Sequence, residues 1–465
     1  MAGNRRRTAG RLQGTRKAWG IFALLTVIFL FGGGSRGDIA YLILLRPLTV
    51  MVGAYALWRM TREERRGAWP LLAFLGIATL LILSHLLPLP PPIWTRLPGR
   101  EIVVEIDRMA GLGLVWRPLS LSPSDTWNAL FSMSVPSAVL LLTLRLDEKE
   151  RWTILPFLIV AALVSGLLGI LQIMGGDGTF NIYGLRGEVT ASGLFTNRNH
   201  AAVFLGCVPP MLAVWASNDA VTVQRARFHQ LAAGAIALAT IPLILVTGSR
   251  AGLIAGVIGF AAAMALYRAP ALLAEARRPA KHRVLPYALA GVVAVVLAAV
   301  TVLMSRGEAF DRLFAHGGSE IRFRMWGPIA QIGARYFPFG SGFGSFERVY
   351  QVYEPNAQLR TTYANHAHND WLEMYMTGGV PGILLLVVAF VGWAAMSYSV
   401  WRKPLAAGGE VALGRLATVM ILILGIASLG DYPLRVPSLA SVAAVAVVWL
   451  YRAALGRLGH TRSGG

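Results

Sequence analysis

The chain has 465 residues, of which 55% are hydrophobic and only 14% are charged. Because a soluble domain carries about 25% charged residues, this composition excludes an ordinary soluble globular protein. The net charge is +20, but no basic run is long or interleaved with aromatic residues, so membrane topology explains the charge better than nucleic-acid binding. The single cysteine, Cys207, excludes a disulfide within the chain and is most simply a small buried hydrophobe.

The apolar residues come in blocks about as long as the ~20 residues that cross a bilayer as a helix. They predict an all-α polytopic membrane protein with about twelve transmembrane helices and a helical outside loop between the ninth and the tenth. No small-residue cleavage site follows Phe31, so the first block is interpreted as a retained span and not as a signal peptide. The predicted spans are residues 19–34, 38–58, 69–88, 127–144, 153–174, 197–217, 230–247, 251–267, 285–304, 371–399, 414–430 and 436–451.

Positive charge predicts the orientation of these spans. With a cytoplasmic N-terminus, the inside segments hold most of the Lys and Arg, including all four lysines. Cytoplasmic segments carry such an excess, so both termini are predicted to be cytoplasmic. The predicted organisation is a tail at 1–18, transmembrane helices 1–9 at 19–304, an outside loop at 305–370, transmembrane helices 10–12 at 371–451 and a second tail at 452–465.

An unexpected number of arginines remains on the outside. Seven lie in the loop 305–370, and Arg198, Arg250 and Arg435 lie in other outside segments. Arginine without lysine favours bidentate binding of phosphate or carboxylate. A genome that prefers Arg codons explains the ratio of Arg to Lys equally well. It does not explain why these arginines gather on the face that carries the histidines.

Two short polar motifs begin apolar segments on this face. Asn197-Arg-Asn-His200 places four polar side chains at a helix N-terminus, where free N–H groups favour anions, although capping by Thr196 or Asn197 is an alternative. Ser249-Arg250 joins two spans with almost no loop. This tight turn favours an arginine that points into the protein, and an arginine that snorkels to the interface is the alternative.

The outside loop contains an amphipathic segment and then a glycine-rich stretch. In Ile321-Arg-Phe-Arg-Met-Trp326 and the residues after it, apolar positions recur with the helical period, which predicts a surface helix carrying Arg322 and Arg324. The stretch Phe337–Phe346 lacks the strand and the Gly-Lys-Ser/Thr end of a phosphate loop, so it does not predict a nucleotide site. We predict a flexible turn there that can lie against a ligand.

His366, His368, Asn369, Asp370 and Glu373 stand where the tenth span begins. Polar side chains at the mouth of a span are costly to desolvate and indicate a functional site. Three interpretations stay open. The His-x-His spacing with Asp and Glu allows a metal site, Asn369 or Asp370 can cap the helix, and His368 can act as a general base. We favour the base.

Three more charged residues stand in or between spans. In the link Gly430–Pro437, Asp431 and Arg435 either pair with each other or hold a catalytic group in place. Arg46 lies within the second span. A lipid-facing arginine there is costly, so we expect it to face the interior of the bundle.

The order of these motifs resembles the O-antigen ligase and polymerase superfamily (Wzy/WaaL type). Each motif is weak alone, but together, in this order and on one face, they form a strong signal that covers about residues 190–440. The sequence departs from the family at Arg198, where members often carry proline. The motifs are Asn197-Arg-Asn199, Ser249-Arg250, Arg322 with Trp326, Gly340-Ser-Gly342, His368-Asn369 with Leu372-Glu373, Gly379-Val-Pro-Gly382 and Asp431–Arg435.

The resemblance implies a metal-independent, inverting glycosyltransferase without cofactors, in the bacterial inner membrane, whose periplasmic active site uses the loop 305–370. The donor is then a glycan on undecaprenyl diphosphate and the acceptor a glycan or lipid A–core. The family's two arginines and one histidine carry over onto Arg250, Arg322 and His368, with Arg324 and His366 as competing candidates. Further predicted roles are support for the site by His366, Arg324, Asn369, Glu373, Asp431 and Arg435, and binding of the donor diphosphate by Arg198, Asn199 and Arg46.

Two activities share this chemistry, and one alternative belongs to another class. A polymerase extends repeat units of O-antigen or exopolysaccharide, whereas a ligase attaches finished polymer to lipid A–core, and we slightly favour the polymerase. A flippase or other transporter of lipid-linked glycans predicts ionisable residues through the middle of several spans. Here Arg46 is almost alone in such a place.

Overall fold

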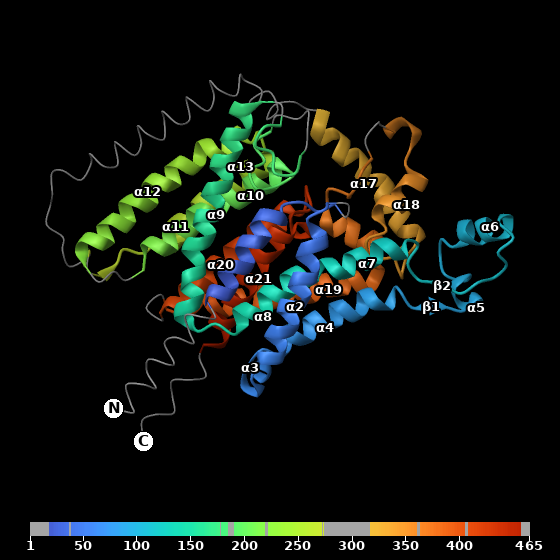
Figure 1. Cartoon of the computed structure of the whole chain (residues 1–465), viewed down its shortest axis with the longest axis horizontal. Helices are drawn as coiled ribbons and strands as arrows, with labels where there is room; N and C mark the ends of the chain where they lie inside the picture. Colours follow the sequence, from blue (N-terminus) through green and yellow to red (C-terminus); the bar gives the residue numbers. More distant parts are fainter. Residues whose placement is uncertain are drawn as a thin grey trace.

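The computed structural model of the protein describes residues 18–36, 39–176, 178–184, 190–218, 222–271, 273, 317–359, 363–404 and 408–456, with side chains in the loop helix from residue 323 onward. Over these ranges the fold is a bundle of helices with one pair of two-residue strands (Figure 1). The structure therefore confirms the helical, multi-pass architecture.

Eight helices among the described residues are long and apolar enough to cross a membrane. Three shorter apolar helices are Ala18–Phe31, α4 (Trp69–Ser84) and α13 (Arg250–Leu266). Every predicted span on described residues coincides with one of these helices, whereas the predicted ninth span, 285–304, lies outside the described residues, so the count of twelve stays a prediction. The long helices are α2 (Leu42–Arg59), α7 with α8 (Pro123–Ser132, Ser134–Leu144), α9 (Glu148–Gly175), α10 with α11 (Arg198–Gly206, Val208–Ala216), α12 (Val223–Val246), α19 (Asp370–Trp401), α20 (Gly409–Ala427) and α21 (Pro437–Leu455).

The centre of the bundle is formed by α10, α11, α20 and α21. In the most apolar 18-residue stretch of α10 and α11, 94% of the residues are buried, and the two helices pack against α9, α12, α13 and α20. Helix α21 packs against α20 and α8, and α8 against α2. The most buried apolar side chains belong to these helices, as expected where a helix is apolar on all sides. We call the end of the bundle where α10, α13, α19 and α21 begin the site end.

The outside loops carry short elements of their own. A small unit projects beyond α4 and α7 (Figure 1) and contains strands β1 (Pro88–Leu89) and β2 (Arg117–Pro118), paired antiparallel, with α5 (Pro91–Trp94) and α6 (Glu101–Met109). The predicted surface helix is α17 (Gly317–Arg335), which buries Met325, Ile329 and Ile332 and exposes Phe323. Helix α18 (Phe346–Tyr353) and a 3-10 turn at Asn356–Gln358 follow it.

The glycine-rich stretch is a packed joint and not the flexible turn that the sequence predicts. Its backbone is hydrogen-bonded to α19, with 3.0 Å from the Ser341 N–H to the Met376 carbonyl and 2.8 Å from the Val380 N–H to the Pro338 carbonyl. Helix α19 is broken at Gly379, whose φ of +56° favours glycine, and the backbones of Gly379 and Gly340 leave no room for a Cβ between them. This joint fixes the first turns of α19, which carry the histidine motif.

Cations close the helix ends at the opposite end of the bundle. The Arg452 guanidinium donates to the carbonyl of Leu144 at 2.7 Å, where α8 ends. Arg415 donates to the carbonyls of Trp401 at 3.2 Å and Lys403 at 2.7 Å, where α19 ends. The Lys403 ammonium donates to the carbonyl of Ala454 at 3.0 Å in the last turn of α21. These bonds satisfy carbonyls that a helix C-terminus leaves without partners.

Candidate functional site

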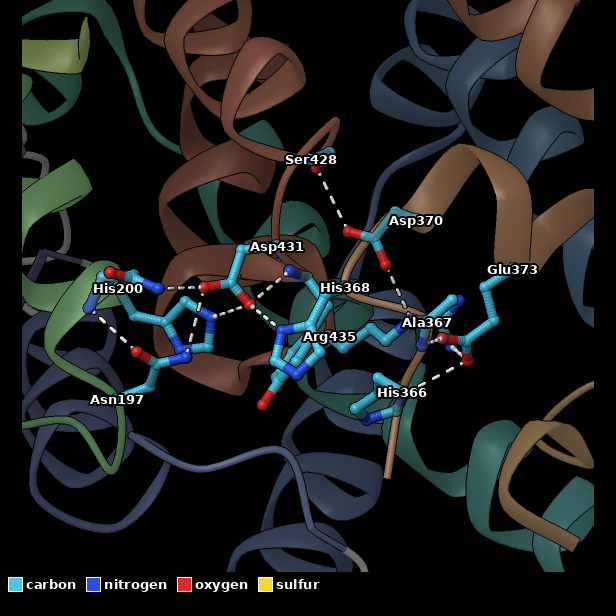
Figure 2. Close-up of polar contacts among 12 residues, drawn as sticks. Asn197, His200, His366, Ala367, His368, Asp370, Glu373, Ser428, Asp431 and Arg435 are labelled. Atoms are coloured by element: carbon cyan, nitrogen blue, oxygen red, sulfur yellow. Dashed lines mark hydrogen bonds and ion pairs between the residues drawn. The ribbon is translucent and has the colours of Figure 1, made fainter. Parts of the chain in front are cut away.

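A buried carboxylate, Asp431, organises the first half of the site (Figure 2). Its Oδ2 accepts from the side-chain amides of Asn197 at 3.2 Å and Asn199 at 2.6 Å. Its Oδ1 accepts from the Tyr432 backbone N–H at 3.1 Å and lies 3.2 Å from His368 Nδ1. A buried charge needs such partners because desolvation is costly. We call these residues the Asp431 cluster, and they join the start of α10, the start of α19 and the link between α20 and α21.

His368 is presented by an unusual backbone. Its φ is +48°, a region that residues other than glycine seldom adopt and that is enriched at functional sites. The ring stays 21% exposed while Asp431 is buried. Because Nδ1 faces the carboxylate, Nε2 is the nitrogen left to meet a substrate. A histidine held by a carboxylate in this way can act as a general base.

A second cluster surrounds Arg435 in the 3-10 turn η3 (Pro433–Arg435). Its Nε donates to Asp370 at 2.7 Å, and a terminal nitrogen lies 3.0 Å from Glu373. Glu373 also pairs with His366 Nδ1 at 3.1 Å and accepts from the Ala367 N–H at 2.9 Å. Burial lowers the pKa of Arg435, but the carboxylates of Glu373 and Asp370 outweigh it and raise that pKa above its ordinary value. The guanidinium is therefore charged, and these residues form the Arg435 cluster.

The two clusters show which partners the charged residues of the link between α20 and α21 have. Arg435 pairs with Asp370 and Glu373, while Asp431 holds His368 (Figure 2). Of the two interpretations of this link, the structure therefore supports the one in which its charges hold other groups of the site.

Tyr432 connects the clusters, and sequence reasoning missed it. Its buried ring lies 4.5 Å from the His366 ring, 5.0 Å from the His368 ring and 5.2 Å from the His200 ring, between centroids. Asp370 belongs to the histidine motif, but the sequence offers it only as a helix cap or a metal ligand and does not predict its pairing with Arg435. The signal was present, because Tyr432 adjoins Asp431 and Asp370 adjoins Asn369.

A cavity of about 1010 Å³ opens beside the Arg435 cluster. Its size is that of a ligand site, and its body continues between α4, α8, α19, α20 and α21. The residues at its mouth are polar and those of its body are apolar. The mouth includes Arg36, Asp125, Glu347, Arg348, Tyr363, His366, Asp370 and Arg435, and the body includes Phe74, Met133, Leu386, Trp393, Ile421 and Ala443.

Arg198 and Arg250 begin neighbouring helices at the site end. Asn197 caps α10 by accepting from the Asn199 N–H at 2.9 Å, and it contributes its amide to Asp431 as well, so capping and a site role coexist. Ser249 caps α13, and Gly252 packs so closely on Ala202 of α10 that a Cβ has no room. Arg198 thus adjoins Asn197 and Asn199 of the Asp431 cluster, and Arg250 is an exposed residue at the start of the helix that packs on α10.

The remaining predicted residues either lie apart from the two clusters or have side chains outside the described residues. Arg46 is half-buried and donates to Ser132 Oγ at 3.1 Å, and Ser132 lines the cavity, so the predicted inward orientation is confirmed. Arg324 is exposed on α17, and its backbone carbonyl accepts from the Gln358 amide at 3.2 Å. Arg322 belongs to α17, but its side chain lies outside the described residues.

Asn369 acts as a helix cap in the structure. Its side chain accepts from the Leu372 N–H at 3.0 Å at the start of α19. The capping interpretation of the histidine motif is therefore correct for Asn369, beside the carboxylate pairs of the two histidines. Across the described residues, no group of three His, Cys, Asp or Glu side chains is arranged to hold a metal ion.

The fold and this site define a multi-pass helical membrane protein with paired carboxylates and histidines at one end of its bundle. A family model described as O-antigen ligase matches residues 235–387, a range that contains Arg250, His366 and His368. The match confirms the resemblance to the O-antigen ligase and polymerase superfamily. The Asp431 side of the site and the motif at the start of α10 lie outside the matched range. No curated protein matches the chain.

Proposed function

We propose that this protein transfers a glycan from undecaprenyl diphosphate to a hydroxyl of an acceptor sugar at the periplasmic face of the inner membrane, in O-antigen or exopolysaccharide assembly. The observation that carries the proposal is the pair of His368 and Asp431 at 3.2 Å. It lies in a chain whose central part matches the O-antigen ligase family. Of the two activities, we propose repeat-unit polymerisation.

His368 is the general base of the proposed reaction. The acceptor hydroxyl gives its proton to Nε2, and its oxygen attacks the anomeric carbon of the donor sugar from the face opposite the diphosphate. The configuration at that carbon inverts. Asp431 stabilises the imidazolium that forms, because it accepts from Nδ1 and is itself held by Asn197 and Asn199.

Arginines stabilise the leaving group. As the bond from the anomeric carbon to the phosphate oxygen breaks, undecaprenyl diphosphate leaves with the electron pair. Arg250 and Arg322 are the residues that we propose to neutralise this charge, with Arg198, Asn199 and Arg46 binding the donor diphosphate. This chemistry needs no metal ion, so addition of EDTA should leave the rate of transfer unchanged. Loss of activity that added Mg²⁺ or Zn²⁺ restores would contradict that expectation.

The cavity is the proposed groove for the polyprenyl chain. Its apolar body suits an isoprenoid, and its polar mouth contains His366 and Arg435, which lie next to the proposed reaction centre. His366 makes the same kind of pair with Glu373 that His368 makes with Asp431. It therefore remains the competing base, and separate His366→Ala and His368→Ala variants distinguish the two roles. We expect the larger loss from His368→Ala.

Deletion of the gene in its host tests the function. Lipopolysaccharide and exopolysaccharide are separated on gels, and lipid-linked glycans are extracted in parallel. Single repeat units on the lipid A–core, or loss of secreted polymer with normal lipopolysaccharide, support the polymerase. Complete loss of long chains from the core, with polymer still on undecaprenyl diphosphate, identifies a ligase instead. Unchanged glycans in both fractions would overturn the proposal.

A further inference from the structure

His200 is a buried histidine that the proposed reaction does not use. His200 is 1% exposed, and among the described residues neither nitrogen of its ring has a hydrogen-bond partner. A buried polar group without a partner is costly, so it calls for an explanation. Its Nε2 lies 3.7 Å from Oδ1 of Asp431, too far for a hydrogen bond and close enough to become one (Figure 2).

Two histidines therefore face the same carboxylate oxygen. His368 occupies Oδ1 from the substrate side, and His200 approaches it from α10. The two rings differ in freedom, because His368 is partly exposed and His200 is enclosed, with its ring edge-on to Tyr432. His368 is thus the ring that can turn toward solvent between turnovers, and His200 is the ring that keeps its place.

A turn of His368 away from Asp431 has an energetic consequence. The carboxylate is buried, and the loss of one donor leaves part of its charge uncompensated, which is unfavourable. A neutral His200 whose Nε2 carries the proton can replace that donor. It needs to close the 3.7 Å separation to the ~2.9 Å of an ordinary N–H···O hydrogen bond.

We propose that His200 is a positioning residue that acts through Asp431. It donates its Nε2–H to Oδ1 when the His368 ring turns away between turnovers, so Asp431 stays ionised and in place to accept from Nδ1 again during the next transfer. His200 exchanges no proton with the substrate. This inference rests on the proposed glycan transfer and adds to it a residue outside the range that the family model matches.

Two substitutions separate a donor from a packing residue. His200→Phe keeps an aromatic ring beside Tyr432 but removes the N–H, whereas His200→Gln keeps an N–H donor and removes the ring. We expect His200→Phe to lower the rate of transfer per molecule at least about tenfold, the loss expected for one hydrogen bond to an ionised group. His200→Gln should stay within about threefold of the unsubstituted protein, a difference below 1 kcal/mol. Cys207→Ala, a fully buried change at the end of the same helix α10, is the matched control.

The assay uses full-length variants in membranes of a strain that lacks the gene, with the lipid-linked glycan extracted from that strain as the probe. Amounts of each variant are compared by immunoblot. A second measurement is a double-mutant cycle with Asp431→Asn. If His200 acts through Asp431, His200→Phe adds little further loss in that background.

The outcomes separate this inference from the function on which it rests. Retained transfer in His200→Phe with loss in His200→Gln would show packing only and overturn the inference. So would losses that add fully in the double-mutant cycle. In both cases the function stands as long as His368→Ala is inactive. Full transfer by His368→Ala would instead remove the proposed base, and with it the reason for a positioning residue.

Discussion

The two ends of the helix bundle use arginine in different ways. At the site end, Arg435 lies between Asp370 and Glu373, and carboxylates also hold His366 and His368. At the opposite end, Arg415 and Arg452 donate to backbone carbonyls where helices end. An imidazole can exchange a proton near neutral pH, whereas a backbone carbonyl cannot. Among the described residues, histidines held by carboxylates therefore distinguish the site end from the opposite end, where Arg151 also pairs with Glu410.

The comparison predicts opposite consequences for substitutions at the two ends. A change within the Asp431 cluster should remove activity, and a change among the cations of the opposite end should remove stability. The Arg435 cluster should show both effects, because Glu373 is buried, and Asp370 and Arg435 line the cavity.

The largest effect is expected from Asp431→Asn. The amide can no longer stabilise the imidazolium of His368, and its NH₂ competes with the donors of Asn197 and Asn199. We expect the rate of glycan transfer per molecule to fall about 10²- to 10⁴-fold, the range that general-base catalysis contributes. Transfer is measured in membranes with the lipid-linked glycan extracted from the deletion strain. A rate within threefold of the unsubstituted protein would rule out a catalytic dyad.

The next effect is expected from Arg435→Met, which leaves the buried Glu373 and the mostly buried Asp370 without their cation. Breaking a buried ion pair from one side costs about 3–5 kcal/mol, so both thermal stability and transfer should fall. Thermal unfolding in detergent measures the first effect.

The matched variant combines Arg435→Met with Asp370→Asn and Glu373→Gln. It removes the uncompensated charge and should regain most of the stability, because a neutral replacement of a buried pair is often tolerated. It should not regain transfer. Recovery of both would mean that the Arg435 cluster serves the fold alone.

A smaller effect, on stability only, is expected from Arg415→Met at the opposite end. The substitution keeps much of the side chain beside Trp401 and leaves the carbonyls of Trp401 and Lys403 without this donor. We expect a loss of about 1–3 kcal/mol in the free energy of unfolding and an unchanged rate of transfer per folded molecule. Thermal unfolding and the transfer assay on the same preparation check both parts. A loss of transfer at full stability would remove the distinction between the two ends.

The spans could be predicted from the sequence, and the pairings within the site could not. Long apolar runs allow only helices in a bilayer, so hydropathy located every span that falls on described residues. The polar motifs were also placed correctly at one end of the bundle. Which charges meet is decided by the packing of α19 against α20 and α21. Arg435 and Asp431 are four residues apart, yet Arg435 binds Asp370 and Glu373 of α19.

The prediction of a flexible turn in the glycine-rich stretch was wrong for a related reason. Glycine indicates conformational freedom in a sequence, but it also allows backbones to approach closely. Here the close approach of Gly340 to Gly379 and of Gly342 to Ser120 determines the structure. Both contacts join segments far apart in the chain, and a local pattern does not contain them.

The smallest effect is expected from Arg324→Ala on helix α17. Arg322 and Arg324 compete for the role of the second arginine at the diphosphate. Arg324 is exposed, and its backbone carbonyl accepts from the Gln358 amide. We expect Arg324→Ala to change transfer less than about twofold, as is usual for an exposed substitution, and Arg322→Ala to lower it about 10²-fold or more. Arg335→Ala, an exposed change on the same helix, is the control. If Arg324→Ala instead caused the large loss, the phosphate-binding face of α17 would be the one that carries Arg324. The donor diphosphate would then bind at Arg324 and not at Arg322.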